Sequence, residues 1–168
     1  VEELFNDRAN QCQLMHEALK YYANILNPFS IQAAAKLKEL KEMGLKYDII
    51  APSHGAVWRD NPNQIIELYE KWANGLSENQ VTICYDTMWE GTAKIAHKIA
   101  AEINHQAKDV NVKVFNLAKH DKNEIMTEIF KSKAIAVGSP TECNNILPSV
   151  AGWLTFLKML KFKNKKAV

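Results

Sequence analysis

The segment from Val81 to Ile103 constrains the fold of this chain more than any other. An apolar, β-prone run ends at Asp86, and six residues rich in hydroxyl groups lead to Thr92. Apolar residues then recur with helical spacing, at Ile95, Ala96, Ile99, Ala100 and Ile103. The pattern predicts a strand, a loop and a helix. In such a unit the N–H groups of the helix N-terminus point to one place above the sheet, where an anion such as a phosphate would bind.

The loop contains a single glycine, so it matches neither the P-loop pattern of nucleotide triphosphatases nor the G-x-G-x-x-G pattern of Rossmann dinucleotide sites. It resembles instead the phosphate loop of flavodoxin-like domains. This resemblance rests on the segment Thr87-Met-Trp-Glu-Gly-Thr92, which begins with a hydroxyl residue, has a small residue at the turn and ends with a threonine. For so short a match, an ordinary connection between strand and helix is the alternative.

Composition narrows the class of protein. The chain has 168 residues, which suits one domain without excluding two partial ones, and its net charge is only +2. We therefore expect no nucleic-acid partner, and we interpret the basic run at 158–166 as a solvated surface. No apolar run approaches the roughly 20 residues of a membrane span, and the N-terminus does not resemble a signal peptide. The absence of an initiator Met suggests a fragment or a processed chain.

The cysteines indicate a reducing compartment. Three of them, Cys12, Cys84 and Cys143, lie far apart and form no C-x-x-C motif. An odd number at such spacings signals neither a disulfide framework nor a zinc site, so we expect a cytoplasmic protein.

The first 76 residues are predicted to be mainly helical. Apolar periodicity predicts one or two helices over 2–26, closed by Asn27-Pro28, and a helix over 31–43 with Ser30 as its N-cap. The short apolar run 47–51 predicts a buried strand that leads into a Pro-Ser-His-Gly turn. A helix follows at 64–73, and the polar residues 77–80 mark the best domain boundary.

Beyond this boundary strands and helices alternate. Strands are expected at 81–85, 110–116 and 134–138, and helices at 92–107, 122–131 and 148–160. Such alternation predicts an α/β fold, with a parallel sheet of flavodoxin-like strand order 2-1-3 and helices on both faces.

A second unusual loop, Ser139 to Asn145, follows the third strand. In an open α/β sheet ligands bind at the carboxyl ends of strands where the strand order reverses, here between the first and third strands. Both unusual loops therefore fall on one crevice. A flat aromatic ligand there needs polar donors and an apolar wall, which Trp89, Cys143 and Asn144 would provide.

His54 is the candidate metal ligand of the first half. It follows a predicted strand, where a histidine either bonds to its own loop or binds a metal ion. The other histidines are expected on helix faces or loops. The adjacent Ser53 cannot form the oriented pair that nucleophilic catalysis requires, so no catalytic residue is assigned to this chain.

Taken together, the segments resemble flavodiiron proteins, the family of rubredoxin-oxygen oxidoreductases and flavorubredoxin-type nitric oxide reductases. The resemblance runs in order along nearly the whole chain. It is carried by the segments Tyr21–Phe29, Pro52–Gly55, Trp58–Pro62, Tyr85–Trp89, Gly138–Thr141 and Asn144–Pro148.

The resemblance implies two domains: residues 1–76 would be the end of a metallo-β-lactamase-like diiron domain, and residues 77–168 a flavodoxin-like FMN domain. It implies that His54 is the last histidine ligand of the diiron site. The family's H-x-E-x-D motif would lie before Val1, and a third flavin loop would lie after Val168. The implied FMN ligands are Thr87, Met88, Trp89, Gly91, Thr92, Ser139, Pro140, Thr141 and Asn144.

The function implied is that of an oxidoreductase whose FMN relays electrons from a donor such as rubredoxin to a diiron site, where O2 is reduced to water or NO to N2O. A homo-oligomer is expected for the complete protein. Two alternatives remain open at this point: a simple flavodoxin-like electron carrier with a helical accessory segment, and a non-catalytic interaction module.

Overall fold

The computed structural model describes residues 3–168. The chain forms two compact units, Val1–Gly75 and Leu76–Val168.

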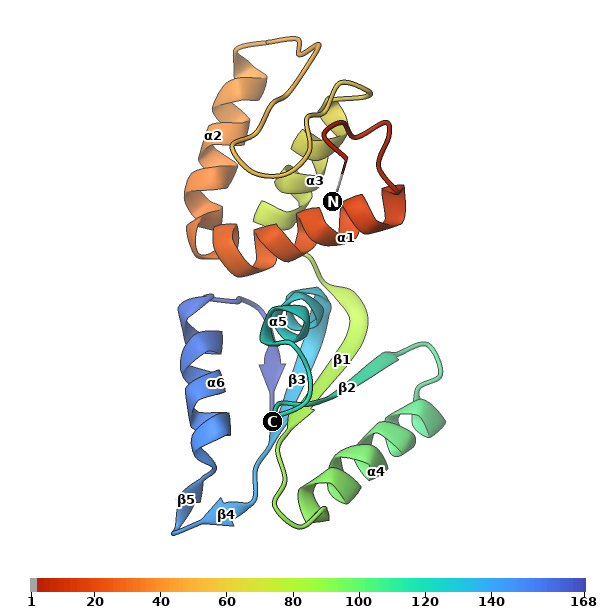
Figure 1. Cartoon of the computed structure of the whole chain (residues 1–168), viewed down its shortest axis with the longest axis vertical. Helices are drawn as coiled ribbons and strands as arrows, with labels where there is room; N and C mark the ends of the chain where they lie inside the picture. Colours follow the sequence, from red (N-terminus) through yellow and green to blue (C-terminus); the bar gives the residue numbers. More distant parts are fainter. Residues whose placement is uncertain (1–2) are drawn as a thin grey trace. The chain divides into compact units, whose positions relative to one another are not determined.

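The second unit is built on a parallel sheet with the strand order β2-β1-β3-β6 (Figure 1). Its strands are β1 (Glu78–Tyr85), β2 (Asn111–Asn116), β3 (Ser132–Gly138) and β6 (Lys166–Ala167). Because β1 pairs in parallel with both β2 and β3, it is central, and the predicted order 2-1-3 is confirmed. The short strand β6 adds beside β3 and was not expected from the sequence.

Helices cover both faces of this sheet, as predicted. Helix α4 (Gly91–Gln106) packs on one face through Ala93, Ala96 and Ala100, against Ile83 and Tyr85 of β1. Helices α5 (Lys122–Lys131) and α6 (Pro148–Met159) pack on the other face (Figure 1). Successive side chains of β1 alternate between the two faces, and because both faces are covered its last three residues, Ile83, Cys84 and Tyr85, are all buried.

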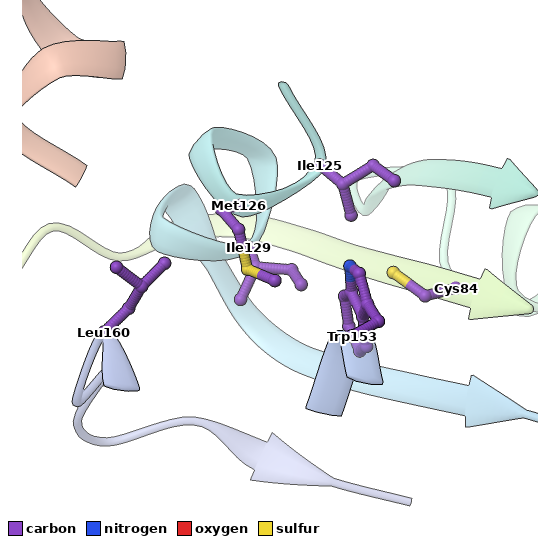
Figure 2. Close-up of a cluster of buried hydrophobic side chains, with 6 residues drawn as sticks. All are labelled: Cys84, Ile125, Met126, Ile129, Trp153 and Leu160. Carbon is purple, nitrogen blue, oxygen red and sulfur yellow. The ribbon is translucent and has the colours of Figure 1, made fainter. Parts of the chain in front are cut away.

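The core under α5 and α6 joins β1 to both helices. Figure 2 shows Cys84 of β1 beside Trp153 of α6, with Ile125, Met126 and Ile129 coming from α5. Burying each large apolar side chain contributes about 1.5–3 kcal/mol. Burial also raises the pKa of the Cys84 thiol to about 12.

A buried polar cluster fixes the register of β1 against β3. The amide of Gln80 donates to Ser132 Oγ at 3.0 Å and to Glu128 Oε2 at 2.9 Å. The hydroxyls of Thr82 and Ser132 lie 2.8 Å apart. Buried polar groups without hydrogen-bond partners are costly, so this network favours one pairing register of β1 and β3. That register determines where the carboxyl ends of the two strands lie relative to each other.

The first unit is helical, with α1 (Gln11–Tyr21), α2 (Ser30–Glu42) and α3 (Asn63–Ala73). A π-helical turn, Tyr22–Leu26, and a 3-10 turn, Asn27–Phe29, connect α1 to α2. The expected end of the first helical segment at Asn27-Pro28 is confirmed, since Asn27 is the C-cap of the π-helical turn, although the 3-10 turn that follows leads directly into α2. Proline is tolerated there because the first turn of a helix needs no N–H donor.

The assignment of Ser30 as an N-cap is wrong. It is the first helical residue of α2, with Phe29 in the cap position. Its hydroxyl donates back to the carbonyl of Asn27. The helical turns before α2 leave no extended residue at this point, and an N-cap requires one.

The buried strand expected at 47–51 does not form. Within the described residues this segment makes only an isolated antiparallel bridge between Ile50 and Trp58, and Ile49 is 59% exposed. A strand is stabilised by pairing along its length, and the described part of the chain provides Ile50 with this bridge alone.

Candidate functional site

The first candidate loop, 87–90, connects β1 to α4. No side chain caps the N-terminus of α4, and the residue before it, Glu90, has a left-handed backbone with φ +61°. The first turn of a helix leaves its N–H groups without intrahelical partners, and here these include Gly91 and Thr92. This end of a 16-residue helix therefore presents N–H donors and the positive end of the helix dipole.

Thr87 carries an unpartnered hydroxyl in this loop. Its Oγ1 is buried and has no hydrogen-bond partner among the described residues. A buried polar group left unpaired costs about 1–3 kcal/mol, which an oxygen atom of a bound ligand would recover. The backbone N–H of Thr87 is already used, since it donates to Asp86 Oδ1 at 2.8 Å. The free donor is therefore the side chain.

The second candidate loop is a β-hairpin rather than an irregular connection. Strands β4 (Thr141–Glu142) and β5 (Asn145–Ile146) pair antiparallel around the two residues Cys143 and Asn144. Both have left-handed backbones, φ +48° and +62°, as a type I′ turn requires. The hairpin follows β3, which lies beside β1 in the sheet.

Ser139 closes the base of the hairpin. Its hydroxyl accepts the N–H of Leu147 at 3.0 Å and donates to the carbonyl of Pro140 at 2.9 Å. This holds the two ends of the loop together just before α6 begins.

All nine predicted flavin ligands lie in the segments that directly follow two adjacent strands, β1 and β3. Trp89 is 87% exposed and Met88 is also exposed, so the first loop presents apolar surface to solvent. Thr141 and Asn144 are exposed in the hairpin. This surface suits a flat ligand with a polar edge.

Three residues of this region were not predicted as site residues. Asp86 is buried, and its carboxylate accepts the hydroxyl of Ser149, in the first turn of α6, at 2.5 Å. Gly138 lies where the first turn of α4 approaches the end of β3. A charged residue directly after an apolar strand is a signal that could have identified Asp86, whereas Ser149 has no comparable signal.

His54 lies in the first unit and is exposed. Its ring centroid is 5.6 Å from that of Tyr21, and both residues line a cavity of about 670 Å³. The cavity lining belongs to the first unit and includes no residue of the two flavin loops.

The described residues do not form a diiron site by themselves. Among residues 3–168 no group of three or more His, Cys, Asp or Glu side chains could hold a metal ion. His54 is therefore part of no such group in the described part of the chain. Nor does any helix within residues 3–168 have the length and apolar character needed to cross a membrane.

Known proteins resemble the chain over both units. The Flavodoxin family model matches residues 83–168. An anaerobic nitric oxide reductase flavorubredoxin of Vibrio vulnificus is 49% identical over 166 residues, which cover 99% of this chain and 34% of that protein. The chain thus spans about a third of the length of the curated relatives it matches.

Solved structures agree with this result. The rubredoxin oxygen:oxidoreductase from Desulfovibrio gigas superposes with a TM-score of 0.94 at 34% identity, covering 99% of this chain and 42% of that one. The flavodiiron protein from Giardia intestinalis superposes with a TM-score of 0.82 at 25% identity, covering 99% and 41%. The chain therefore belongs to the flavodoxin family through residues 83–168, and over its length it is a homologue of flavorubredoxins and flavodiiron proteins.

Proposed function

We propose that the second unit binds FMN in the crevice between the loop Thr87–Thr92 and the hairpin loop Ser139–Asn145. The observation that carries this proposal is the buried, unpartnered hydroxyl of Thr87 beside the uncapped N-terminus of α4. In flavodoxin-like sheets FMN binds at the switch point between the first and third strands, where these loops lie.

The first loop is suited to the phosphate of FMN. The N–H groups of Gly91 and Thr92 and the hydroxyls of Thr87 and Thr92 are donors of the kind that a phosphate dianion accepts. Hydrogen bonds to a charged group contribute about 1.5–3 kcal/mol each, more than bonds between neutral groups. The phosphate is therefore expected to account for much of the affinity.

The hairpin and Trp89 are suited to the isoalloxazine ring. The exposed indole of Trp89 offers an aromatic face, and the hairpin residues Ser139, Pro140, Thr141 and Asn144 offer backbone and side-chain polar groups for the ring edge. When bound, FMN supplies one- and two-electron transfer, and the protein residues supply binding, orientation and shielding from water.

For the complete protein we propose a flavodiiron oxidoreductase. The relatives are named as a nitric oxide reductase flavorubredoxin and a rubredoxin oxygen:oxidoreductase. On this basis the protein transfers electrons from a rubredoxin-type donor, through its flavin, to a diiron site that reduces NO or O2. Residues 1–76 would belong to the metallo-β-lactamase-like domain and would contribute His54 as one ligand. A cytoplasmic homo-oligomer is part of this proposal.

A simple flavodoxin-like electron carrier is the second candidate. Both loops of the FMN crevice lie in Leu76–Val168, whereas the described residues of the first unit form no metal cluster. These observations favour a chain that by itself carries out electron transfer through flavin alone. The two candidates differ in iron content and in reduction of NO or O2, measured on a protein extended to the length of the relatives.

Titration of the purified chain with FMN tests the proposed site, with flavin fluorescence and visible absorbance as readouts. Riboflavin, which lacks the phosphate, is the matched control ligand. We expect FMN to bind at least about tenfold more tightly than riboflavin, because a single good hydrogen bond to the phosphate increases the affinity by about that factor. Equal binding of the two would disprove the assignment of the phosphate loop, and binding of neither would disprove the site.

A further inference from the structure

The structure assigns a positioning role to Asp86. We propose that its buried carboxylate holds the phosphate loop and the start of α6 at a fixed separation, so that both loops can contact one flavin. This inference rests on the proposed FMN site and concerns a residue that is not expected to contact FMN itself.

Asp86 occupies the point where the two loops diverge. Its backbone N–H donates to the carbonyl of Gly138 at 3.1 Å, which ties the end of β1 to the end of β3. Carboxylate oxygen Oδ1 accepts the N–H of Thr87 at 2.8 Å, and Oδ2 accepts the hydroxyl of Ser149 at 2.5 Å. One side chain therefore joins the first residue of the phosphate loop to the helix that follows the hairpin.

The environment of Asp86 explains how a buried carboxylate is accommodated. The residue is 8% exposed, and within residues 3–168 no lysine, arginine or histidine forms an ion pair with it. Its charge is met by an N–H, a hydroxyl and the N-terminus of α6, where Ser149 is the second residue. This carboxylate links the two loop segments through two directional hydrogen bonds, which an apolar side chain cannot make.

Substitutions separate this role from a general effect on stability. Asp86→Ala removes both hydrogen bonds and Ser149→Ala removes one. Asp86→Asn can keep both, because its amide oxygen still accepts the N–H of Thr87 and its amide nitrogen can donate to Ser149 Oγ. Asp121→Ala is the matched control: that carboxylate also accepts two hydrogen bonds, but from Asn123 and Glu124 at the start of α5, outside both flavin loops.

The first measurement is FMN affinity of this chain. We expect Asp86→Ala to weaken FMN binding at least about tenfold, Ser149→Ala to weaken it by a smaller factor, and Asp86→Asn to stay within about threefold of the unmodified chain. Asp121→Ala should leave FMN affinity unchanged. Equal affinities for Asp86→Ala and Asp121→Ala would overturn the inference, as would a loss in Asp86→Asn equal to that in Asp86→Ala.

The second measurement needs no flavin. Amide hydrogen exchange of the ligand-free chain should show faster exchange over 87–92 in Ser149→Ala, although residue 149 is remote in sequence, and no such change in Asp121→Ala. Unchanged exchange over 87–92 in Ser149→Ala would overturn the link itself. A different outcome is that Ser149→Ala speeds hydrogen exchange over 87–92 but the unmodified chain does not bind FMN. In that case the proposed function would be wrong, and with it the role of Asp86 in flavin binding.

Discussion

A Cβ atom placed on Gly138 would lie 2.9 Å from Thr92 Cγ2, closer than side-chain carbons approach each other in proteins. The first turn of α4 therefore lies so close to the end of β3 that a side chain on residue 138 would force Thr92 to move. This approach brings the N-terminus of α4, whose N–H groups are candidate hydrogen-bond donors to the phosphate, next to the strand from which the hairpin loop starts.

Replacement of Gly138 by alanine is expected to disturb both packing and binding. The added methyl group forces Thr92 or the start of α4 to move, and overpacking of this kind costs about 1–3 kcal/mol in the free energy of unfolding. FMN affinity should fall by about tenfold if one phosphate contact is lost. Denaturant unfolding and flavin titration measure the two effects.

Gly152→Ala is the control for this substitution. Gly152 lies inside α6, and apart from its chain neighbours and the backbone of its own helix nothing lies within 4 Å of an added Cβ, so alanine should stabilise the helix by about 0.5–1 kcal/mol and leave FMN affinity unchanged. A Gly138→Ala chain as stable as Gly152→Ala would contradict the close approach to Thr92.

Thr87→Val should have opposite effects on binding and on stability. Valine has the shape of threonine without the unpartnered hydroxyl, so the ligand-free chain should be as stable as before or more stable, by about 1 kcal/mol. FMN affinity should fall about 10- to 100-fold, because a hydrogen bond to the phosphate is lost. Replacing both Thr87 and Thr92 by alanine should abolish binding.

The control for Thr87→Val is Thr155→Val, whose hydroxyl donates to the carbonyl of Ala151 on the exposed surface of α6. It should leave FMN affinity unchanged. If Thr87→Val lowered stability and left binding intact, the hydroxyl of Thr87 would serve the fold rather than the ligand.

This chain by itself should hold no stable diiron centre. Two irons need several carboxylate and imidazole ligands with supporting hydrogen bonds, and His54 supplies only one bond. Elemental analysis after mild dialysis should give well under one iron per chain, with the same value for His54→Ala. Stoichiometric iron that depends on His54 would show that the described residues are sufficient after all.

Cys84 should react with thiol reagents only when the second unit unfolds. It is buried, whereas Cys12 and Cys143 are exposed, so two thiols should react quickly and the third at the rate of unfolding. Burial raises its pKa to about 12 from an ordinary value near 9, so the contribution of Cys84 to stability is complete below pH 9 and is lost as the pH rises toward 12. Cys84→Ala should lose this pH dependence, and rapid reaction of three thiols in the native chain would contradict the burial.

The alternation of strands and helices after residue 80 and the placement of both loops at strand ends could be predicted from the sequence, because they depend on local periodicity and on turn residues. The order 2-1-3 followed from the general rules of parallel sheets. The same local signals failed at 47–51, where an apolar run predicts a strand but pairing has to come from elsewhere. They also gave no indication of the hairpin at 141–146 or of β6.

What only the tertiary structure decided is how the candidate site is held together. Asp86 and Ser149 are 63 positions apart, and Gly138 meets Thr92 only after β1 and β3 have paired. A buried carboxylate or a missing Cβ has no preferred partner in a linear sequence, since its partner is selected by packing. The sequence therefore predicted that both loops would follow adjacent strands, and the packing of the sheet and helices determined the contacts of Asp86 and Gly138.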